Sequence, residues 1–339
     1  MQEFDAMLES VAEQITDYRQ DEVPRPGPDH VERWIGQFPA VDRLPVLREL
    51  DHVLQHTYFS RRDEEAWLHD LIEEMHKDGP GPQEFWTNAH LLDIQRQGRS
   101  QHVLSRRAKG IIEDTWGQLP ERGRPYHRHY VHLDDFVFSG QRACGDLAEW
   151  IRTKAPNRAS VHVCVLAVHR AGEQRLTQLR ALARDAGKTI DVSLDALHWL
   201  EDRTSHSAQS QTLWPTQSLI GRAQHRWPNH QPADCIAPRN PGDARLPFSS
   251  EQGRQLLERA FLEQGLAILS RVNGPREWRA LGGFGSHGYG FGALLVSHRN
   301  CPNTCPLALW WGDPDAKSTS ALGWYPLFPR LTYAGSGGL

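Results

Sequence analysis

Apolar positions along the first part of the chain recur at the spacing of amphipathic helices. Trp34 and Ile35 follow Val31 by three and four positions, and similar spacing continues through residues 44–54. A Pro- and Gly-rich break follows this region. We therefore predict a helical amino-terminal region over residues 1–82.

Strand and helix patterns alternate in the middle of the chain. Apolar strands are predicted at about 128–134, 161–168 and 189–194, with helices between them. Strands that alternate with helices form a parallel sheet covered by those helices. We therefore predict an α/β core over residues 83–204, in which Ser100 is the expected N-cap of a further helix.

The last part of the chain has a less regular pattern. Residues 205–248 are polar and rich in Pro, Gln, His and Arg, which favours a surface excursion or lid. A helix at about 249–269 and a strand at 293–296 are predicted within a carboxyl-terminal extension, 249–333, that packs on the core. Residues 334–339 are expected to form a loose tail.

Composition narrows the class of protein. The chain has 339 residues, 39% of them hydrophobic and 24% charged, as in a globular protein. The net charge of −4 is too small to indicate long-range attraction to nucleic acid or an anionic membrane, so any contact with nucleic acid would be local. No signal peptide or membrane-spanning segment is recognisable, so we expect a cytoplasmic protein without a membrane partner. Five cysteines are an odd, dispersed set that argues against a disulfide framework.

The segment 130–143 carries the candidate chemistry. An apolar strand runs into two acids, Asp134 and Asp135, and continues through Ser139 and Gly140 into a helix. Acids suit sugar hydroxyls, and the free amides at a helix start suit phosphate. A phosphorylated sugar is one interpretation. The other is that the acids only end a strand and cap the next helix.

The same order resembles the ribose-5-phosphate-binding signature of type I phosphoribosyltransferases, which Asp134, Asp135, Val137, Ser139 and Gly140 match. The resemblance implies a type I phosphoribosyltransferase-like sheet in which Asp134 and Asp135 act as catalytic residues on the ribose hydroxyls. It also implies Mg²⁺ and phosphoribosyl pyrophosphate or a nucleotide as ligands. The predicted ligand-binding residues are Phe136, Val137, Phe138, Ser139, Gly140, Gln141, Arg142, Gly98, Arg99 and Ser100.

Four residues depart from that signature. His132 interrupts the apolar strand, Phe136 and Phe138 replace smaller residues, and Arg142 stands where the family usually has threonine. Arg142 can grip phosphate, fill the pocket or pair with Asp134. These departures favour a binding site over transferase chemistry, so enzymatic activity stays open.

A wider resemblance covers most of the chain. It is similar to the phosphoribosyltransferase-like domain family of bacterial conflict systems, PRTase-CE. The segments that carry this likeness are 30–35, 98–101, 134–140, the glycine-rich run 282–292, 302–307 with Trp310, and 324–330.

The PRTase-CE resemblance implies an anti-phage defence effector or accessory protein, in some cases retron-associated. Its partners would be a reverse transcriptase with its non-coding RNA or DNA, or a second effector, and a homo-oligomer is compatible with the sequence. One alternative is a catalytically inactive nucleotide sensor or scaffold. Another is a phosphoribosyltransferase of nucleotide metabolism.

Histidines and cysteines suggest two further clusters. A Cys-x3-Cys spacing without a second ligand pair favours loop packing over zinc, so we predict no metal site there. A second group is either a phosphate-facing basic patch or decoration of a strand edge. The first cluster comprises His298, Cys301 and Cys305, and the second comprises His127, Arg128, His129 and His132.

Overall fold

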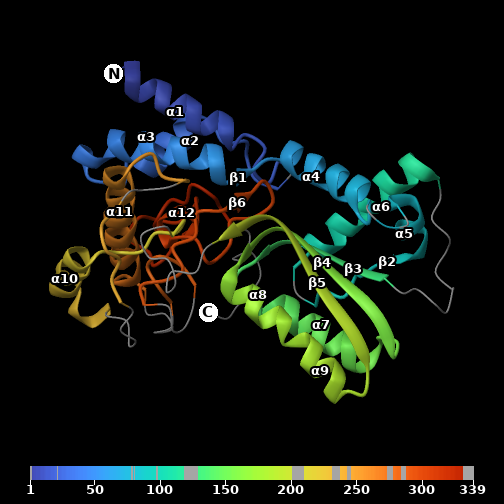
Figure 1. The fold of residues 1–339 in the computed structure, drawn as a ribbon. Helices are drawn as coiled ribbons and strands as arrows, with labels where there is room; N and C mark the ends of the chain where they lie inside the picture. Colours follow the sequence, from blue (N-terminus) through green and yellow to red (C-terminus); the bar gives the residue numbers. More distant parts are fainter. Residues whose placement is uncertain are drawn as a thin grey trace. The chain divides into compact units, whose positions relative to one another are not determined.

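The computed structural model of the chain divides into two compact units. One comprises residues 1–61 and 203–339, and the other comprises residues 62–202. Figure 1 shows the elements of both units. The described residues are 2–20, 22–77, 79, 81–96, 98–117, 129–200, 210–230, 237–242, 246–272, 278–283 and 288–330.

A four-stranded parallel sheet organises the unit 62–202. Its strand order is β2-β3-β4-β5. The strands are β2 (Ala89–Leu91), β3 (His129–Val137), β4 (Arg158–His169) and β5 (Thr189–Leu200). Each strand after β2 pairs with the strand before it in the chain, because an intervening helix returns the chain to the same edge.

Helices cover this sheet, as predicted. The helices of the unit are α4 (Arg61–Glu74), α5 (Pro82–Asn88), α6 (Ser100–Trp116), α7 (Gln141–Thr153), α8 (Arg170–Thr177) and α9 (Leu179–Asp185). Figure 1 shows α7, α8 and α9 together on one side of the strands. Leu147 and Ile151 of α7 pack there with Val163 of β4 and Val192 of β5. The predicted α/β class is confirmed.

Because β2 is short, the last part of β3 has a neighbouring strand on only one side. β2 pairs with β3 only from His129 to Val131, whereas β4 pairs with β3 as far as Val137. The last residues of β3 therefore have β4 on one side and, on the other, the segment that leads into α6. This gap is where the candidate site lies.

The other unit is mainly helical. Its elements are α1 (Gln2–Gln14), α2 (Pro28–Ile35), α3 (Ala40–Thr57), β1 (Tyr58–Phe59), α10 (Gln217–Arg226), the 3-10 helix η2 (Pro228–His230), α11 (Glu251–Leu269), β6 (Val296–Ser297) and α12 (Leu307–Trp310). Aromatic rings fill its core: Trp34 meets Phe38 edge-on at 5.0 Å, and Phe38 meets Trp324 at 5.6 Å. Both indoles donate to the carbonyl of Ala308, which satisfies their buried N–H groups.

The polar segment 205–248 contributes to this core. Leu213 and Trp214 are buried, and α10 lies within the segment. Arg239 is 1% exposed and binds the buried Glu258 at 2.8 Å, so its charge is paired rather than solvated. Part of the predicted excursion 205–248 is therefore buried, whereas much of α10 is exposed.

Other expectations differ in detail. The strand predicted at 293–296 is reduced to β6, a two-residue strand that pairs with β1. Trp199 is 43% exposed on the edge strand β5, although tryptophan is usually found in the core. The tail 334–339 and residues 205–209, 231–236, 243–245 and 284–287 lie outside the described residues. Residues 62–82, predicted with the amino-terminal helices, belong to the same unit as the sheet.

Candidate functional site

The predicted turn after β3 is present. β3 continues through both acids to Val137, and α7 begins at Gln141. Gly140 precedes the helix with φ +69°, a left-handed conformation that favours glycine. The Ser139 hydroxyl accepts a hydrogen bond from the Gln141 amide at 3.3 Å. The turn thus brings the amino end of α7 to the carboxyl edge of the sheet, where parallel-sheet proteins bind ligands.

A second glycine allows this turn to pack. A Cβ atom on Gly172 of α8 would lie 2.6 Å from a methyl carbon of Val137 and 2.8 Å from the Phe138 carbonyl oxygen. A Cβ on Gly140 would lie 3.1 Å from the Gly172 Cα. The two backbones are therefore in near-direct contact, which fixes the position of the turn.

Asp134 is held from two directions. The Ser100 hydroxyl at the start of α6 donates to Asp134 Oδ1 at 2.6 Å, and the Asp135 amide donates to the same oxygen at 2.9 Å. Burial raises the pKa of the Asp134 carboxyl above its ordinary value of 3.8, while hydrogen bonds from Ser100 and Asp135 and the charge of Arg142 lower it.

Glutamines position the segment before α6. The buried side chain of Gln101 accepts hydrogen bonds from the Ile94 and Gln95 amides, both at 2.7 Å. Gln95 in turn accepts from the Gln101 amide at 3.1 Å.

The predicted N-cap role of Ser100 is wrong. Helix α6 begins at Ser100 itself, and Arg99 at the cap position makes no side-chain cap bond. The Ser100 hydroxyl is instead directed to Asp134.

His132, a departure from the family signature, is buried behind the site. Its Nδ1 lies 2.6 Å from the Gln101 side-chain nitrogen, and its Nε2 has no hydrogen-bond partner among the described residues. Burial lowers the pKa of His132 to about 4, so the imidazole is neutral at pH 7. Because the Gln101 nitrogen is a donor, Nδ1 accepts and Nε2 carries the proton.

The structure brings several predicted residues together. Ser100 donates a hydrogen bond to Asp134, and the charge of Arg142 acts on the same carboxyl. The Phe136 and Phe138 rings lie 5.8 Å apart. Gly98, with φ +95°, and Arg99 are exposed in the turn before α6. Gln101 and Gly172 were missed as site residues because their roles depend on contacts far along the chain.

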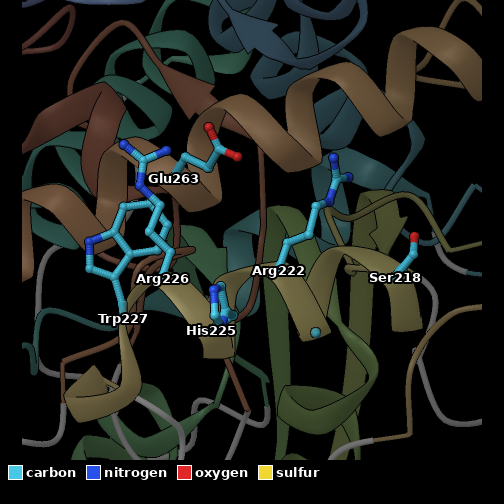
Figure 2. Close-up of a pocket in the computed structure, with 7 residues that line it drawn as sticks. Ser218, Arg222, His225, Arg226, Trp227 and Glu263 are labelled. Atoms are coloured by element: carbon cyan, nitrogen blue, oxygen red, sulfur yellow. The ribbon is translucent and has the colours of Figure 1, made fainter.

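A separate pocket of about 740 Å³ lies in the other unit, between α10 and α11 (Figure 2). Arg222, His225 and Arg226 come from α10, and Glu263 comes from α11. The Arg226 guanidinium lies 4.6 Å from the centre of the Trp227 ring. None of the predicted site residues lines this pocket, and the carboxylate of Glu263 weakens its match to an anionic phosphate.

The described cysteines of the Cys-x3-Cys spacing are buried. Cys301 and Cys305 have no solvent-exposed surface, and Cys305 donates to the Leu295 carbonyl at 3.3 Å. Burial raises the pKa of the Cys305 thiol well above 9.0, which opposes the thiolate form that metals bind. The predicted basic cluster does not form a single patch among the described residues. His129 and His132 point to opposite faces of β3, and His127 and Arg128 lie outside the described residues.

The parallel sheet, its covering helices and the turn after β3 define a phosphoribosyltransferase-like α/β protein. A family model described as PRTase-CE matches residues 31–330, and the chain therefore belongs to the PRTase-CE family. This confirms the resemblance and the fold predicted from sequence. Comparisons with curated proteins and with solved structures gave no match. None of the described helices has the length and apolar character needed to cross a bilayer.

Proposed function

We propose that the β3–α7 turn binds the phosphoribosyl part of phosphoribosyl pyrophosphate or of a nucleotide, and that the protein serves in anti-phage defence. The main support for this proposal is the packing of the left-handed Gly140 on Gly172, which sets the start of α7 beside the end of β3. The first amides of a helix lack partners within it and point outwards toward an anion.

The charges around the turn suit this ligand. No acidic residue occupies the first turn of α7, and the exposed Arg142 adds a positive charge there. Asp134 supplies a carboxylate for a ribose hydroxyl, with its geometry set by Ser100. Mg²⁺ fits this oxygen-rich edge, where it would neutralise the ligand's phosphates.

The burial of Asp134 favours binding without transfer as the second candidate function. Burial raises the pKa of this carboxyl, which disfavours the negative charge that would stabilise a cationic sugar. In that case the protein acts as a nucleotide sensor or scaffold for a reverse transcriptase, its nucleic acid or another effector.

Calorimetric titration with phosphoribosyl pyrophosphate and common nucleotides, with and without Mg²⁺, tests the ligand. We expect Arg142→Ala to weaken binding by about tenfold or more, the loss of one charge-assisted phosphate contact. Arg152→Ala is the matched control, because Arg152 is exposed on the same helix away from the turn. Equal affinity of both variants for the ligand would contradict the proposal that the turn binds phosphate.

Activity and defence need separate measurements. Release of pyrophosphate or a free base that stops in Asp134→Asn would establish transfer, whereas binding without either product supports the sensor. For the defence role, plaque counts are compared in a host carrying the intact locus or the Arg142→Ala variant. Unchanged protection by a variant that no longer binds ligand would separate the site from defence.

A further inference from the structure

Three histidines meet at the opposite end of the sheet from the ligand turn. His129 is the first residue of β3, His162 lies in β4, and His76 follows α4. One ring nitrogen from each lies within 4.8 Å of the corresponding atoms of the other two. His129 Nδ1 and His162 Nε2 are 3.0 Å apart. In a tetrahedral zinc site, metal–nitrogen bonds of about 2.0–2.1 Å place ligand nitrogens about 3.4 Å apart.

The surroundings prepare these rings for a metal. The Ser193 hydroxyl lies 2.9 Å from His162 Nδ1, opposite the nitrogen that faces His129. When Nδ1 donates to Ser193, Nε2 keeps its lone pair for a metal, the second-shell arrangement typical of metal-bound histidine. Phe85 is 2% exposed and lies 4.7 Å from the His76 ring, which makes one wall of the cluster apolar.

His76 reaches the cluster from an unusual backbone conformation. Its φ is +57°, in the left-handed region that few non-glycine residues adopt. The amides of Gly79 and Gly81 donate to its carbonyl at 3.0 and 3.2 Å and hold the turn. Such strain is often retained where it directs a side chain into a site.

The cluster is not sealed from solvent. The three rings retain partial exposure, which leaves room for water at a fourth position.

We propose that His76, His129 and His162 bind a late first-row divalent cation, with zinc as the best match to three neutral imidazoles. The ion would tie the turn after α4 to the amino ends of β3 and β4. This site is independent of the proposed phosphoribosyl site, whose residues lie at the other end of the strands.

Metal binding to the full chain, purified without a metal-affinity tag and stripped with chelator, tests this site. We expect about one zinc per chain by mass spectrometry after dialysis, and a tetrahedral visible spectrum when Co²⁺ is bound. His162→Gln and His76→Gln should each lower zinc affinity by at least about tenfold. His69→Gln, an exposed change on α4, is the control and should retain full binding.

Ser193→Ala keeps all three ligands, so it tests the site even if a histidine substitution prevents folding. It should lower zinc affinity by about 10- to 100-fold while leaving the circular dichroism spectrum of the metal-free protein unchanged. Zinc bound equally by wild type, His162→Gln and Ser193→Ala would overturn the proposal. Failure of the stripped wild type to bind zinc or Co²⁺ would overturn it too, whether or not phosphoribosyl ligands bind.

Discussion

The two ends of β3 present different kinds of site. At the carboxyl end, Gly140 and the acids follow one another within a few residues, and the backbone itself forms the turn. At the amino end, His129 meets side chains that are distant along the chain, His76 and His162. A local motif can therefore be recognised in the sequence, whereas a site assembled by parallel strand register emerges only with the fold.

Gly172→Ala should have the largest effect of these changes, because it disrupts the packing at the carboxyl end of β3. The added Cβ would lie within 2.8 Å of two backbone carbonyl oxygens, so α8 or the β3–α7 turn must move. We expect a loss of about 2–3 kcal/mol in the free energy of unfolding, measured by urea denaturation. Ligand binding at the turn should fall, while zinc binding at the histidines should persist.

Gly110→Ala is the matched control for that change. Gly110 lies in helix α6, and nothing lies within 4 Å of the position a Cβ would take. Its replacement should stabilise the protein by up to about 1 kcal/mol through helix propensity. Equal effects at the two positions would contradict the tight contact between α8 and the turn.

His132→Gln should make the free energy of unfolding less dependent on pH. The folded-state pKa of about 4 lies below the ordinary 6.5, so the unfolded chain binds the extra proton between these values. Stability of the metal-free wild type should therefore fall as pH drops through this window, by up to about 1.4 kcal/mol per pH unit from this residue. Urea denaturation from pH 7 to 4 measures the slope, and His69→Gln should keep it.

Asp134→Asn should act in the opposite direction. Burial raises the pKa of this carboxyl, so the folded protein holds the proton more tightly and loses stability as pH rises above 3.8. The variant should gain stability relative to wild type across that rise. Hydrogen bonds from Ser100 and Asp135 and the charge of Arg142 oppose this effect of burial. A difference between variant and wild type that does not change with pH would refute the raised pKa.

Much of the fold could be predicted because its signals are local. The periodicity of apolar residues predicts β3, β4, β5 and the helices between them, and the glycine at position 140 predicts the turn after β3. β2 was not recognised as a strand, since its three residues have no alternation long enough to see. The buried part of 205–248 was missed because Arg239 and its neighbours are polar, and only pairing with Glu258 explains their burial.

The candidate site was predicted in part for the same reason. Asp134 and the turn form one motif, but the Ser100 contact, the Gln101 anchor and the Gly172 packing depend on tertiary structure. The histidine cluster carries even less local signal. His129 and His162 are 33 positions apart and become neighbours only because β3 and β4 pair in parallel.

Arg96→Ala should have the smallest effect and sharpen the comparison of the two ends. Arg96 binds Asp146 of α7 at 2.7 Å and ties the segment before α6 to the helix that follows the turn. Because Arg96 is 64% exposed, the bridge should contribute only about 0.2–1 kcal/mol, and less at high salt. Urea denaturation at low and high salt measures this. Arg106→Ala, on the exposed side of α6, is the control, and zinc content should not change in either variant. A salt-independent loss above that range would mean that Arg96 holds the site by packing rather than by charge.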